Sequence, residues 1–450
     1  MLKGRSVAAM TLGCKVNQYE TDSMLDMLKN AGAEIVDFDE KADIYIINTC
    51  SVTNIADKKS RQMLHRAKKR NPDGIVIAAG CYVQSAKELL EQDEAVDIVI
   101  SNNKKKDITQ IVIDYINVKE KSDRPVHADN SAVECFVDIS KESEYEEMGG
   151  HTPAEHTRAY VKIQDGCNQF CTYCIIPYVR GRIRSREESA IVEEITSLAA
   201  SGIKEVVLTG IHISSYGKDK NYEGALIDLI DAISKIKGIK RIRLGSLEPG
   251  IITEEFAQRI SANPKVCPHF HLSLQSGCDS VLKRMNRKYT CEQYLEKCDM
   301  LRRAYKDPAL TTDVIVGFPG ESDAEFEETV KYLTRLNLYE MHIFKYSPRK
   351  GTVAAAMDNQ VQPEVKNARS DVLLDLSEKN KKAYEAGFEG QELEVLVEEV
   401  VRKDGSVYLR GHTERYMDVL INVGAADIPE SFVNSFVYTR YTQDGELYLI

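Results

Sequence analysis

The first third of the chain alternates short, almost wholly apolar runs with amphipathic stretches. The apolar runs cover residues 6–14, 42–50, 74–81 and 97–101. Apolar residues recur at helical spacing at about residues 19–31, 56–70, 84–91 and 107–116. Strands that are apolar on both faces and alternate with helices are typical of a parallel sheet covered by helices on both sides. We therefore expect a doubly wound α/β sheet in an N-terminal domain of residues 1–118.

A second alternation of apolar runs and helical stretches follows a polar connector. The connector, residues 119–156, carries one β-favouring segment at 133–139. The expected strands then cover 158–164, 205–209, 241–245, 269–274, 310–316 and 340–346, and the expected helices 187–200, 226–237, 254–262, 279–284, 291–305 and 323–336. Six βα units are fewer than the eight of a closed TIM barrel. We assign these units to a central domain of residues 157–385.

The pattern changes again near the C-terminus. A Lys- and Arg-rich helix is predicted at 363–385, and short β-favouring segments follow it at 392–401, 406–410, 417–423, 435–442 and 446–450. Five short strands separated by Gly and Asp-Gly turns are typical of a small β-barrel of the oligonucleotide-binding type. We expect such a module in residues 386–450.

Bulk composition narrows the class of protein. Hydrophobic residues make up 43% of the chain and charged residues 29%, as in water-soluble globular proteins. No apolar run reaches the roughly 18 residues of a membrane span, and no secretory h-region precedes the first strand. The 11 cysteines are an odd number, which suits reduced thiols or metal ligands. We expect a cytoplasmic protein that does not bind membranes.

Three cysteines after the first strand of the central domain form a compact motif. Cys167, Cys171 and Cys174 follow the spacing Cys-x3-Cys-x2-Cys. Three thiolates can bind three irons of a four-iron cluster and leave the fourth iron open to a small chelating molecule. A zinc knuckle is the alternative, but zinc favours four ligands, and no His or fourth Cys follows closely. Buried, unliganded thiols are the other alternative.

Three further cysteines end three predicted strands of the N-terminal sheet. Cys14, Cys50 and Cys81 stand at those ends, and small neighbours (Gly13, Thr49, Gly80) leave space beside them. Doubly wound sheets bind ligands outside the carboxyl ends of their strands, so these thiols should meet at one edge. We predict a second iron–sulfur cluster there, with chance placement as the alternative.

The motif of Cys167, Cys171 and Cys174, with Phe170 and Tyr173 inside it, resembles the signature of the radical S-adenosylmethionine (radical SAM) superfamily. Together the two cysteine triples resemble the methylthiotransferase family over essentially the whole chain. The resemblance implies two 4Fe-4S clusters and S-adenosylmethionine as cofactors, with Cys14, Cys50 and Cys81 holding the auxiliary, sulfur-donating cluster. It also implies an open (βα)6 barrel and a C-terminal TRAM domain.

The same resemblance points to cofactor-binding residues at the ends of the barrel strands. Related enzymes bind the amino group of S-adenosylmethionine through backbone groups where Thr209 and Gly210 stand in this chain. Other candidates follow later strands: Ser246, Glu248, Ser273, Gln275 and Gly317. Turn chemistry is the alternative for each. We interpret the remaining cysteines as structural, namely Cys135, Cys267, Cys278, Cys291 and Cys298.

Net charge is −11, so RNA contacts would have to be local. Four alternating arginines, Arg180, Arg182, Arg184 and Arg186, suit phosphate contacts, and salt bridges to Glu187, Glu188 and other acids are the alternative. Residues 58–70 hold seven Lys or Arg and no acid, and this basic patch can bind phosphates, with a solvated helix face as the alternative. From Ala386 onward 12 acids face five Lys or Arg, so RNA binding there would rest on groups such as Arg410, His412, Arg415 and Tyr416. A purely structural cap is the alternative.

Three sequence segments resemble one branch of the family more than the others, and the branches differ in substrate. Thr-Leu-Gly-Cys14-Lys-Val-Asn-Gln, Asn48-Thr-Cys50-Ser-Val-Thr-Asn and Leu208-Thr-Gly-Ile-His look most like the branch that methylthiolates N6-threonylcarbamoyladenosine at position 37 of tRNA. The partners implied are that tRNA and an electron donor such as a flavodoxin or ferredoxin, with no DNA. Alternatives are N6-isopentenyladenosine in tRNA, a ribosomal-protein aspartate, a non-enzymatic iron–sulfur RNA-binding sensor and a zinc-structured RNA-binding protein.

Overall fold

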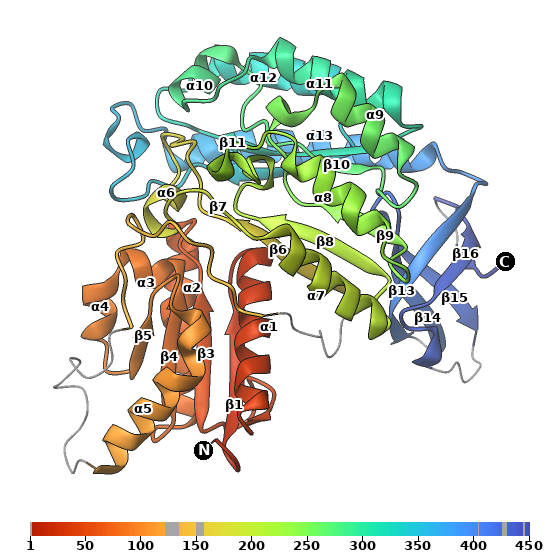
Figure 1. The fold of residues 1–450 in the computed structure, drawn as a ribbon. Helices are drawn as coiled ribbons and strands as arrows, with labels where there is room; N and C mark the ends of the chain where they lie inside the picture. The colour runs from red at the N-terminus through yellow and green to blue at the C-terminus, as the bar shows by residue number, and fades with distance from the viewer. Residues whose placement is uncertain (1, 122–134, 150–156, 404, 425–429, 444–445) are drawn as a thin grey trace.

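The computed structural model describes residues 2–121, 135–149, 157–403, 405–424, 430–443 and 446–450. Three modules follow one another along the chain (Figure 1). The N-terminal α/β module, drawn in red and orange, lies below the central barrel, and the blue C-terminal β module lies at the side of the barrel. The α/β class of the first two modules and the β-rich C-terminus are as predicted.

The N-terminal module is a five-stranded parallel sheet in the order β2-β1-β3-β4-β5. Its strands are β1 (Ser6–Thr11), β2 (Glu34–Ile35), β3 (Ile44–Thr49), β4 (Ile75–Gly80) and β5 (Ile98–Ile100). Successive residues of β3 enter two separate hydrophobic cores: Ile44 and Ile46 pack with α1 (Lys15–Asn30) and α5 (Ile108–Lys121). Tyr45 and Ile47 pack on the other side. The helices there are α2 (Asn54–Arg70), α3 (Cys81–Ser85) and α4 (Lys87–Glu91). The sheet is therefore doubly wound, as its apolar strands predicted.

The central module is an open barrel of six parallel strands. They are β6 (Arg158–Asp165), β8 (Glu205–Gly210), β9 (Arg241–Leu244), β10 (His269–His271), β11 (Ala309–Val316) and β12 (Glu340–Lys345). A short strand, β7 (Arg184–Ser185), pairs antiparallel with β6. Single bridges, Ile242 to Val266 and Leu247 to Leu272, connect the chain of β9 to that of β10. No pairing among the described strands returns from β12 to β6, so the barrel stays open.

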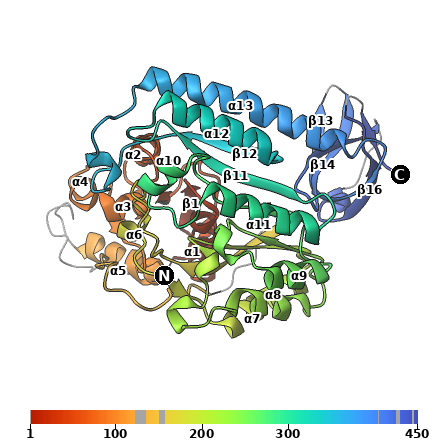
Figure 2. The ribbon, with the colours of Figure 1, turned by 90° about the horizontal axis from the view of Figure 1, so that it is seen from above.

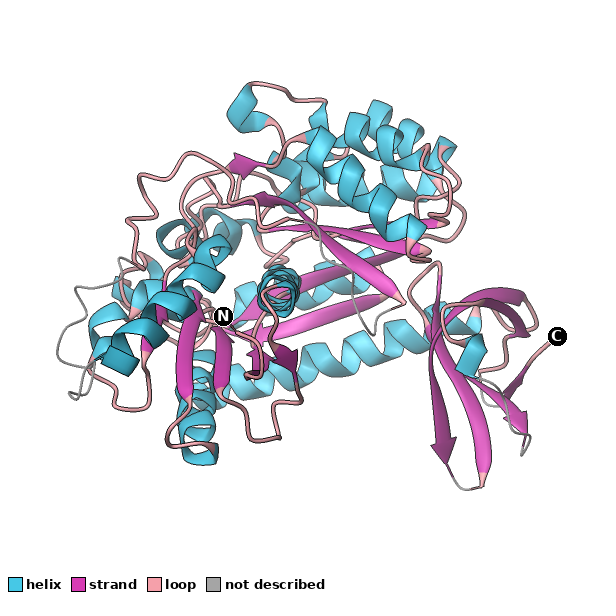
Figure 3. Ribbon diagram, turned by 60° about the horizontal axis from the view of Figure 1, so that its bottom comes forward, coloured by secondary structure: helices cyan, strands magenta, loops and turns pink. Residues whose placement is uncertain are grey.

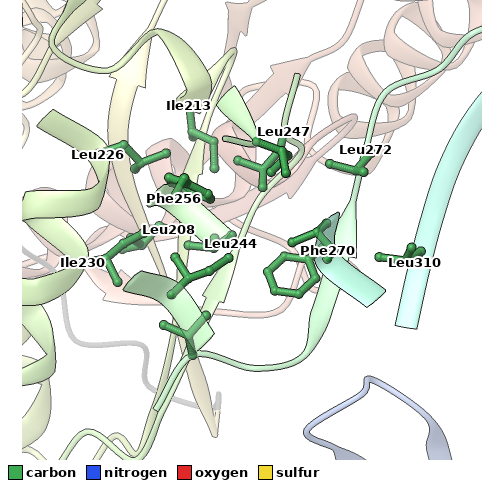
Figure 4. Packing of buried hydrophobic residues seen from close by; sticks show 14 of the residues in the cluster. Leu208, Ile213, Leu226, Ile230, Leu244, Leu247, Phe256, Phe270, Leu272 and Leu310 are labelled. Carbon is green, nitrogen blue, oxygen red and sulfur yellow. The ribbon is translucent and has the colours of Figure 1, made fainter. Parts of the chain in front are cut away.

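Helices cover the outside of the barrel and bury its apolar strands. They are α7 (Glu188–Ala200), α8 (Ala225–Ser234), α9 (Glu254–Ala262), α10 (Asp279–Arg284), α11 (Cys291–Ala304) and α12 (Asp323–Leu336). Figure 4 shows Leu208 and Leu244 of the sheet beside Ile230 of α8 and Phe256 of α9, all of them buried. Thr290 and Ser322 form capping boxes that begin α11 and α12.

A long helix leads from the barrel to the C-terminal module. Helix α13 (Pro363–Ala386) runs along the edge of the barrel (Figures 2 and 3). The strands that follow are β13 (Glu392–Lys403), β14 (Ser406–Thr413), β15 (Asp418–Gly424), β16 (Phe436–Arg440) and β17 (Leu447–Tyr448). Their order is β16-β13-β14-β15-β17, and an antiparallel bridge from Thr439 to Leu449 connects the two edges. This closes the small β-barrel that the sequence predicted.

The C-terminal module is fixed to the amino ends of the central strands. Arg243 donates hydrogen bonds to the carbonyl oxygens of Thr413 and Glu414, at 2.6 and 2.9 Å. The Tyr416 ring, in the turn that follows, lies 5.1 Å from the His269 ring. Because ligands of such barrels bind at the carboxyl ends of the strands, this module occupies the opposite end from the expected site.

One predicted strand is wrong. Of the segment 133–139, residues 133 and 134 lie outside the described residues, and Cys135–Ile139 form no strand. The Cys135 carbonyl accepts from the Ser101 backbone amide at 3.0 Å, but the Val137 amide donates to the Ser101 side chain. A ladder needs successive backbone pairs, and the side chain interrupts it here. The limits proposed for the domains and the connector stay predictions. No helix in the described part of the chain has the length and apolarity to cross a bilayer.

Candidate active site

The loop that follows β6 carries Cys167, Cys171 and Cys174. Its first turn requires a glycine, because Gly166 has a φ of +72° and a Cβ there would lie 1.8 Å from the Arg182 carbonyl oxygen. The end of α10 holds the loop in place. The Thr172 amide donates to the Met285 carbonyl at 3.1 Å, and the Asn286 amide group donates to the Phe170 carbonyl at 3.0 Å. The three thiols are therefore presented by a tightly bound loop.

Two N–H donors point at these thiols. Arg287 donates from Nη1 to Cys171 Sγ at 3.3 Å, and the Gln169 amide donates to Cys167 Sγ at 3.4 Å. Burial raises the pKa of Cys167 to about 11 and that of Cys174 to about 12. Iron binding must therefore displace protons from these thiols, and the donors stabilise the thiolates that result.

A cavity of about 310 Å³ lies against the three cysteines. The ends of β10 and β11 contribute polar wall residues, Ser273, Gln275 and Asp313 among them. Val52 and Thr53 of the N-terminal module complete another part of the wall. Its volume suits one small molecule, at the lower end of the range for ligand pockets.

A charged network fixes one wall of this cavity. Arg287 Nη2 lies 3.0 Å from Glu248 Oε1, and His212 Nε2 lies 3.2 Å from Glu248 Oε2. Burial opposes ionisation of Glu248, but the His212 hydrogen bond and the Arg287 charge hold its pKa below its ordinary value. Glu248 is thus an oriented carboxylate that can accept hydrogen bonds from a ligand. Sequence reasoning missed Arg287, which belongs to no motif, and it quoted His212 only as the end of the segment Leu208-Thr-Gly-Ile-His, without a role at the site.

The predicted cofactor-binding residues divide into two groups. Glu248, Ser273 and Gln275 line the cavity, and Thr209, Gly210, Ser246 and Gly317 are not among its lining residues. Ser246 is exposed, and the Gly317 amide donates to Glu321 at 2.6 Å. The roles of all seven stay predictions.

The second cysteine triple meets at the carboxyl edge of the N-terminal sheet. Cys14 precedes α1, Cys50 follows β3 and Cys81 begins α3. Gly13 has a φ of +105°, and a Cβ there would lie 2.8 Å from Cys50 Sγ. Burial, followed by the charges of the neighbouring Cys81 and Cys14 thiolates, raises the pKa of Cys50 to about 11. The three thiols form one group, as their strand-end positions predicted.

The donor set bears on the zinc alternative. In the described part of the chain, the ligand atoms of His271, Asp313 and His342 lie within 4.8 Å of one another and could hold a single metal ion. This set contains none of the six cysteines of the two triples. Three thiolates leave one position of a tetrahedral zinc site unfilled, whereas a four-iron cluster takes one thiolate at each of three irons.

A single turn of helix connects the two cysteine triples. Helix α6 (Ile176–Val179) begins two residues after Cys174, and Val179 packs against Cys81 in a small hydrophobic cluster. Arg180 follows directly and donates from Nε to Cys81 Sγ at 3.2 Å. The segment that begins at one thiol triple therefore ends in contact with the other.

Arg180 also belongs to a buried group of charges between the two modules. Its Nη2 donates to Asn17 Oδ1 at 2.6 Å and lies 3.0 Å from Glu20 Oε2. Lys162 lies 2.7 Å from Glu20 and 2.6 Å from Asp165, and Lys105 also pairs with Glu20. All these charged side chains are at most 4% exposed. The network joins α1 to the barrel.

This burial corrects the expected RNA contacts of the alternating arginines. Arg180, Arg184 and Arg186 are at most 2% exposed. Arg184 donates to the carbonyl oxygens of Arg180 and Arg182, and Arg186 pairs with Glu147 and Glu194. Guanidiniums that are enclosed and paired do not reach phosphates, so the salt-bridge alternative holds for these three. Arg182 is exposed and lies 4.4 Å over the Phe170 ring.

The two arginines predicted to bind RNA in the C-terminal module have different partners. Arg410 is exposed and pairs with Glu399 at 3.0 Å and with Asp418 at 2.9 Å. Arg415 donates to the carbonyl oxygens of Asp307 and Lys306, at 3.0 and 3.1 Å. Arg415 therefore helps to attach the module to the barrel, and an RNA role for either arginine stays a prediction.

Two family models match the chain. The family model described as "Radical SAM superfamily" matches residues 161–333, and that described as "Uncharacterized protein family UPF0004" matches residues 6–101. Among solved structures, the radical S-adenosylmethionine methyltransferase TsrM from Kitasatospora setae has a TM-score of 0.56 at 15% identity, covering 76% of each chain. The enzyme OxsB has a TM-score of 0.51 at 14% identity, covering 85% of this chain and 57% of its own. These likenesses show the fold.

Sequence relatives match over nearly the whole chain. "Threonylcarbamoyladenosine tRNA methylthiotransferase MtaB" of Bacillus subtilis is 40% identical over 92% of this chain and 90% of its own length. The protein of the same name from Aquifex aeolicus is 38% identical over 92% and 98%. "tRNA-2-methylthio-N(6)-dimethylallyladenosine synthase" of Thermodesulfovibrio yellowstonii is 36% identical over 95% of each. The chain belongs to the radical SAM methylthiotransferase family.

Proposed function

We propose that this protein transfers a methylthio group to C2 of N6-threonylcarbamoyladenosine at position 37 of tRNA. The observation that carries the proposal is the pair of cysteine triples, connected by α6 and Arg180. Relatives at 40, 38 and 37% identity are named for this substrate, and relatives named for dimethylallyladenosine follow at 36%. The order of these relatives supports the threonylcarbamoyl branch.

The family's cofactors are two 4Fe-4S clusters and S-adenosylmethionine, and the donor sets fit them. Cys167, Cys171 and Cys174 would hold the radical-generating cluster, and Cys14, Cys50 and Cys81 the auxiliary one. When bound, these groups would supply the radical and the sulfur. Each triple supplies three thiolates, so one iron of a four-iron cluster would have no protein ligand.

The residues around the 310 Å³ cavity would bind and orient S-adenosylmethionine. Glu248, held by Arg287 and His212, offers carboxylate oxygens to hydroxyl or ammonium donors. Apolar wall residues such as Ile175 and Phe344 exclude water from the reacting atoms. Holding the two cysteine triples on one rigid frame supplies the proximity that a two-cluster reaction needs.

Helix α2 offers a surface for tRNA phosphates. Lys58, Lys59 and Lys69 are exposed and form no ion pair among the described residues, whereas Arg66 and Arg70 both pair with Asp39. The loop before α2 supplies Val52 and Thr53 to the cavity wall. Phosphates bound to α2 would therefore lie beside the entrance for the substrate base. The protein would act in the cytoplasm, where a flavodoxin or ferredoxin would supply electrons to its clusters.

Mass spectrometry of tRNA nucleosides from a deletion strain and its parent tests the substrate. We expect 2-methylthio-N6-threonylcarbamoyladenosine to disappear and its unthiolated precursor to accumulate. An unchanged level of that nucleoside would refute the proposal and direct attention to dimethylallyladenosine and to protein substrates. Release of 5′-deoxyadenosine by the reduced protein separates an enzyme from an RNA-binding sensor, which forms none.

A further inference from the structure

A second cavity, of about 520 Å³, lies between all three modules. Its walls come from the loop around Cys14, from the start of β6 and from β13. Cys14 is the exposed member of its triple, while Cys50 and Cys81 are buried. The auxiliary thiol group therefore opens to solvent on the side of this cavity.

The cavity contains a lysine without an acidic partner. Lys15 follows Cys14 directly, lines the cavity and is exposed to it. Its ammonium lies 5.9 Å from the centre of the Tyr160 ring and forms no ion pair or hydrogen bond within the described residues. A cation in this position is available to an anionic ligand.

The acids of the same cavity are already paired with other cations. Glu398 lies 3.3 Å from Arg158 and 3.0 Å from His412, and Glu399 lies 3.0 Å from Arg410. Nη1 of Arg158, despite its closeness to Glu398, has no hydrogen-bond partner in the described structure. Lys15 and Arg158 thus have spare hydrogen-bond donors on one cavity wall, and a carboxylate is the group that they fit best.

Cys14 of the proposed sulfur-donating triple lines this cavity, so the substrate carbon that receives sulfur would lie beside it. C2 and C6 of adenine flank the same ring nitrogen, so a substituent on N6 lies within a few bonds of the carbon that receives sulfur. The threonylcarbamoyl substituent carries a carboxylate, whereas the dimethylallyl substituent is an uncharged hydrocarbon. Resting on the proposed function, we propose that Lys15, assisted by Arg158, binds the carboxylate of the threonylcarbamoyl group and selects this substrate.

The protein would discriminate between the two bases because the dimethylallyl base leaves charged groups of the cavity without partners. An apolar substituent in this cavity would leave the Lys15 ammonium and the Arg158 donor desolvated without partners. Sites built to pair with a polar group reject analogues that lack it more strongly than apolar pockets reject an added polar group. Lys15 would therefore weaken binding of the dimethylallyl base as well as strengthen binding of the threonylcarbamoyl base.

The test compares anticodon stem-loops that differ by one charge. One carries N6-threonylcarbamoyladenosine, and the other carries the methyl ester of the same base. With the cluster-loaded wild-type protein we expect the dissociation constant to be about 10- to 100-fold lower for the acid, the range for one hydrogen bond between charged groups. Equal affinities for acid and ester would overturn the inference without any variant.

Variants assign the preference to a residue. Lys15→Met should lose most of the preference for the acid, because only Arg158 then remains to bind the carboxylate, and Lys15→Arg should retain more of it. Lys29→Met, an exposed lysine at the far end of α1, is the matched control. Iron content and absorption spectra establish that the clusters are intact, and Arg158→Met should show a smaller loss in the same direction. A Lys15→Met protein with the wild-type preference would refute the role of Lys15.

Failure of this inference is distinguishable from failure of the proposed function. If wild-type protein methylthiolates the threonylcarbamoyl stem-loop while Lys15→Met keeps the full preference for the acid, only the carboxylate subsite is wrong. If wild-type protein binds the acid more tightly than the ester but modifies neither base, the proposed reaction is wrong, while the binding subsite stands.

Discussion

Arg180 of the central module donates a hydrogen bond from Nε to Sγ of Cys81 in the N-terminal module, at 3.2 Å. The bond spans 99 residues of sequence and is fully enclosed. Hydrogen bonds to cluster sulfurs, together with nearby positive charge, are among the features that set the reduction potential of an iron–sulfur cluster. Arg180, which directly follows α6, therefore contacts a proposed ligand of the auxiliary cluster.

Replacing Arg180 should lower the reduction potential of the auxiliary cluster. Arg180→Lys keeps the charge but loses the planar donor to Cys81, so we expect a more negative potential with the cluster retained. Potentiometric titration followed by electron paramagnetic resonance measures it, in a Cys171→Ala background that removes the second signal. Arg182→Lys, exposed and two residues away, is the control. An unchanged potential in Arg180→Lys would show that the bond has no electronic effect.

Substitutions in the two cysteine triples should remove different products of the reaction. Cys171→Ala should abolish formation of 5′-deoxyadenosine, because it removes a proposed ligand of the radical-generating cluster. Cys50→Ala should keep some cleavage of S-adenosylmethionine and form no methylthio product. Chromatography of the reaction mixture measures both products. Methylthio product from Cys50→Ala, or S-adenosylmethionine cleavage by Cys171→Ala, would contradict the respective assignment.

The exposed lysines of α2 should account for part of the salt dependence of tRNA binding. A protein that loses two phosphate contacts shows a log–log salt slope that is shallower by about 1.4 to 1.8. We expect this change for the double variant Lys58→Ala, Lys59→Ala, measured by fluorescence anisotropy at several salt concentrations. Arg66→Ala is the matched control, because Arg66 is already paired with Asp39. An equal change of slope in both proteins would rule out a specific role for the two lysines.

The fold could be predicted largely from periodicity, and the exceptions have local causes. Every barrel strand is found near its predicted place, because each is an apolar run between turns. The strand predicted at 269–274 ends at His271, because its regular pairing with β11 stops there and only single bridges follow, Leu247 to Leu272 and Gln275 to Val314. The two-residue strands β2 and β7 are too short for any alternation to show.

The grouping of the six cysteines into two triples was predictable, because it follows from residue type and strand position, and their roles as cluster ligands stay predictions. The alternating arginines were misread because a run of cations looks the same whether it faces solvent or buried acids. Arg180 is buried only because Glu20 from α1 and Asp165 from β6 converge on it, and these acids lie 160 and 15 residues away. Arg287 and Lys15 likewise acquire their roles from the assembly of distant segments.

The buried charges around Glu20 make a prediction about acid stability. Burial opposes its ionisation, but Arg180, Lys105 and Lys162 together hold the pKa of Glu20 well below its ordinary value. Glu20→Gln leaves these cations without their shared acid, so we expect unfolding to become easier by about 3–5 kcal/mol at pH 7. Urea unfolding of the metal-free protein measures this difference. Glu187→Gln, which removes an exposed pair with Lys220, should change it by less than about 1 kcal/mol.

The sign of the pH dependence follows from the depressed pKa. A carboxylate whose pKa is lower in the folded than in the unfolded protein stabilises the fold above its unfolded pKa, about 4.3 for Glu. Below that pH the unfolded state takes up the proton first, and the stabilisation falls by about 1.4 kcal/mol per pH unit. The difference between wild type and Glu20→Gln should therefore be constant from pH 7 to 5 and shrink below about 4.3. A difference that stays constant at pH 3.5 would mean that Glu20 does not carry the charge that holds the two modules together.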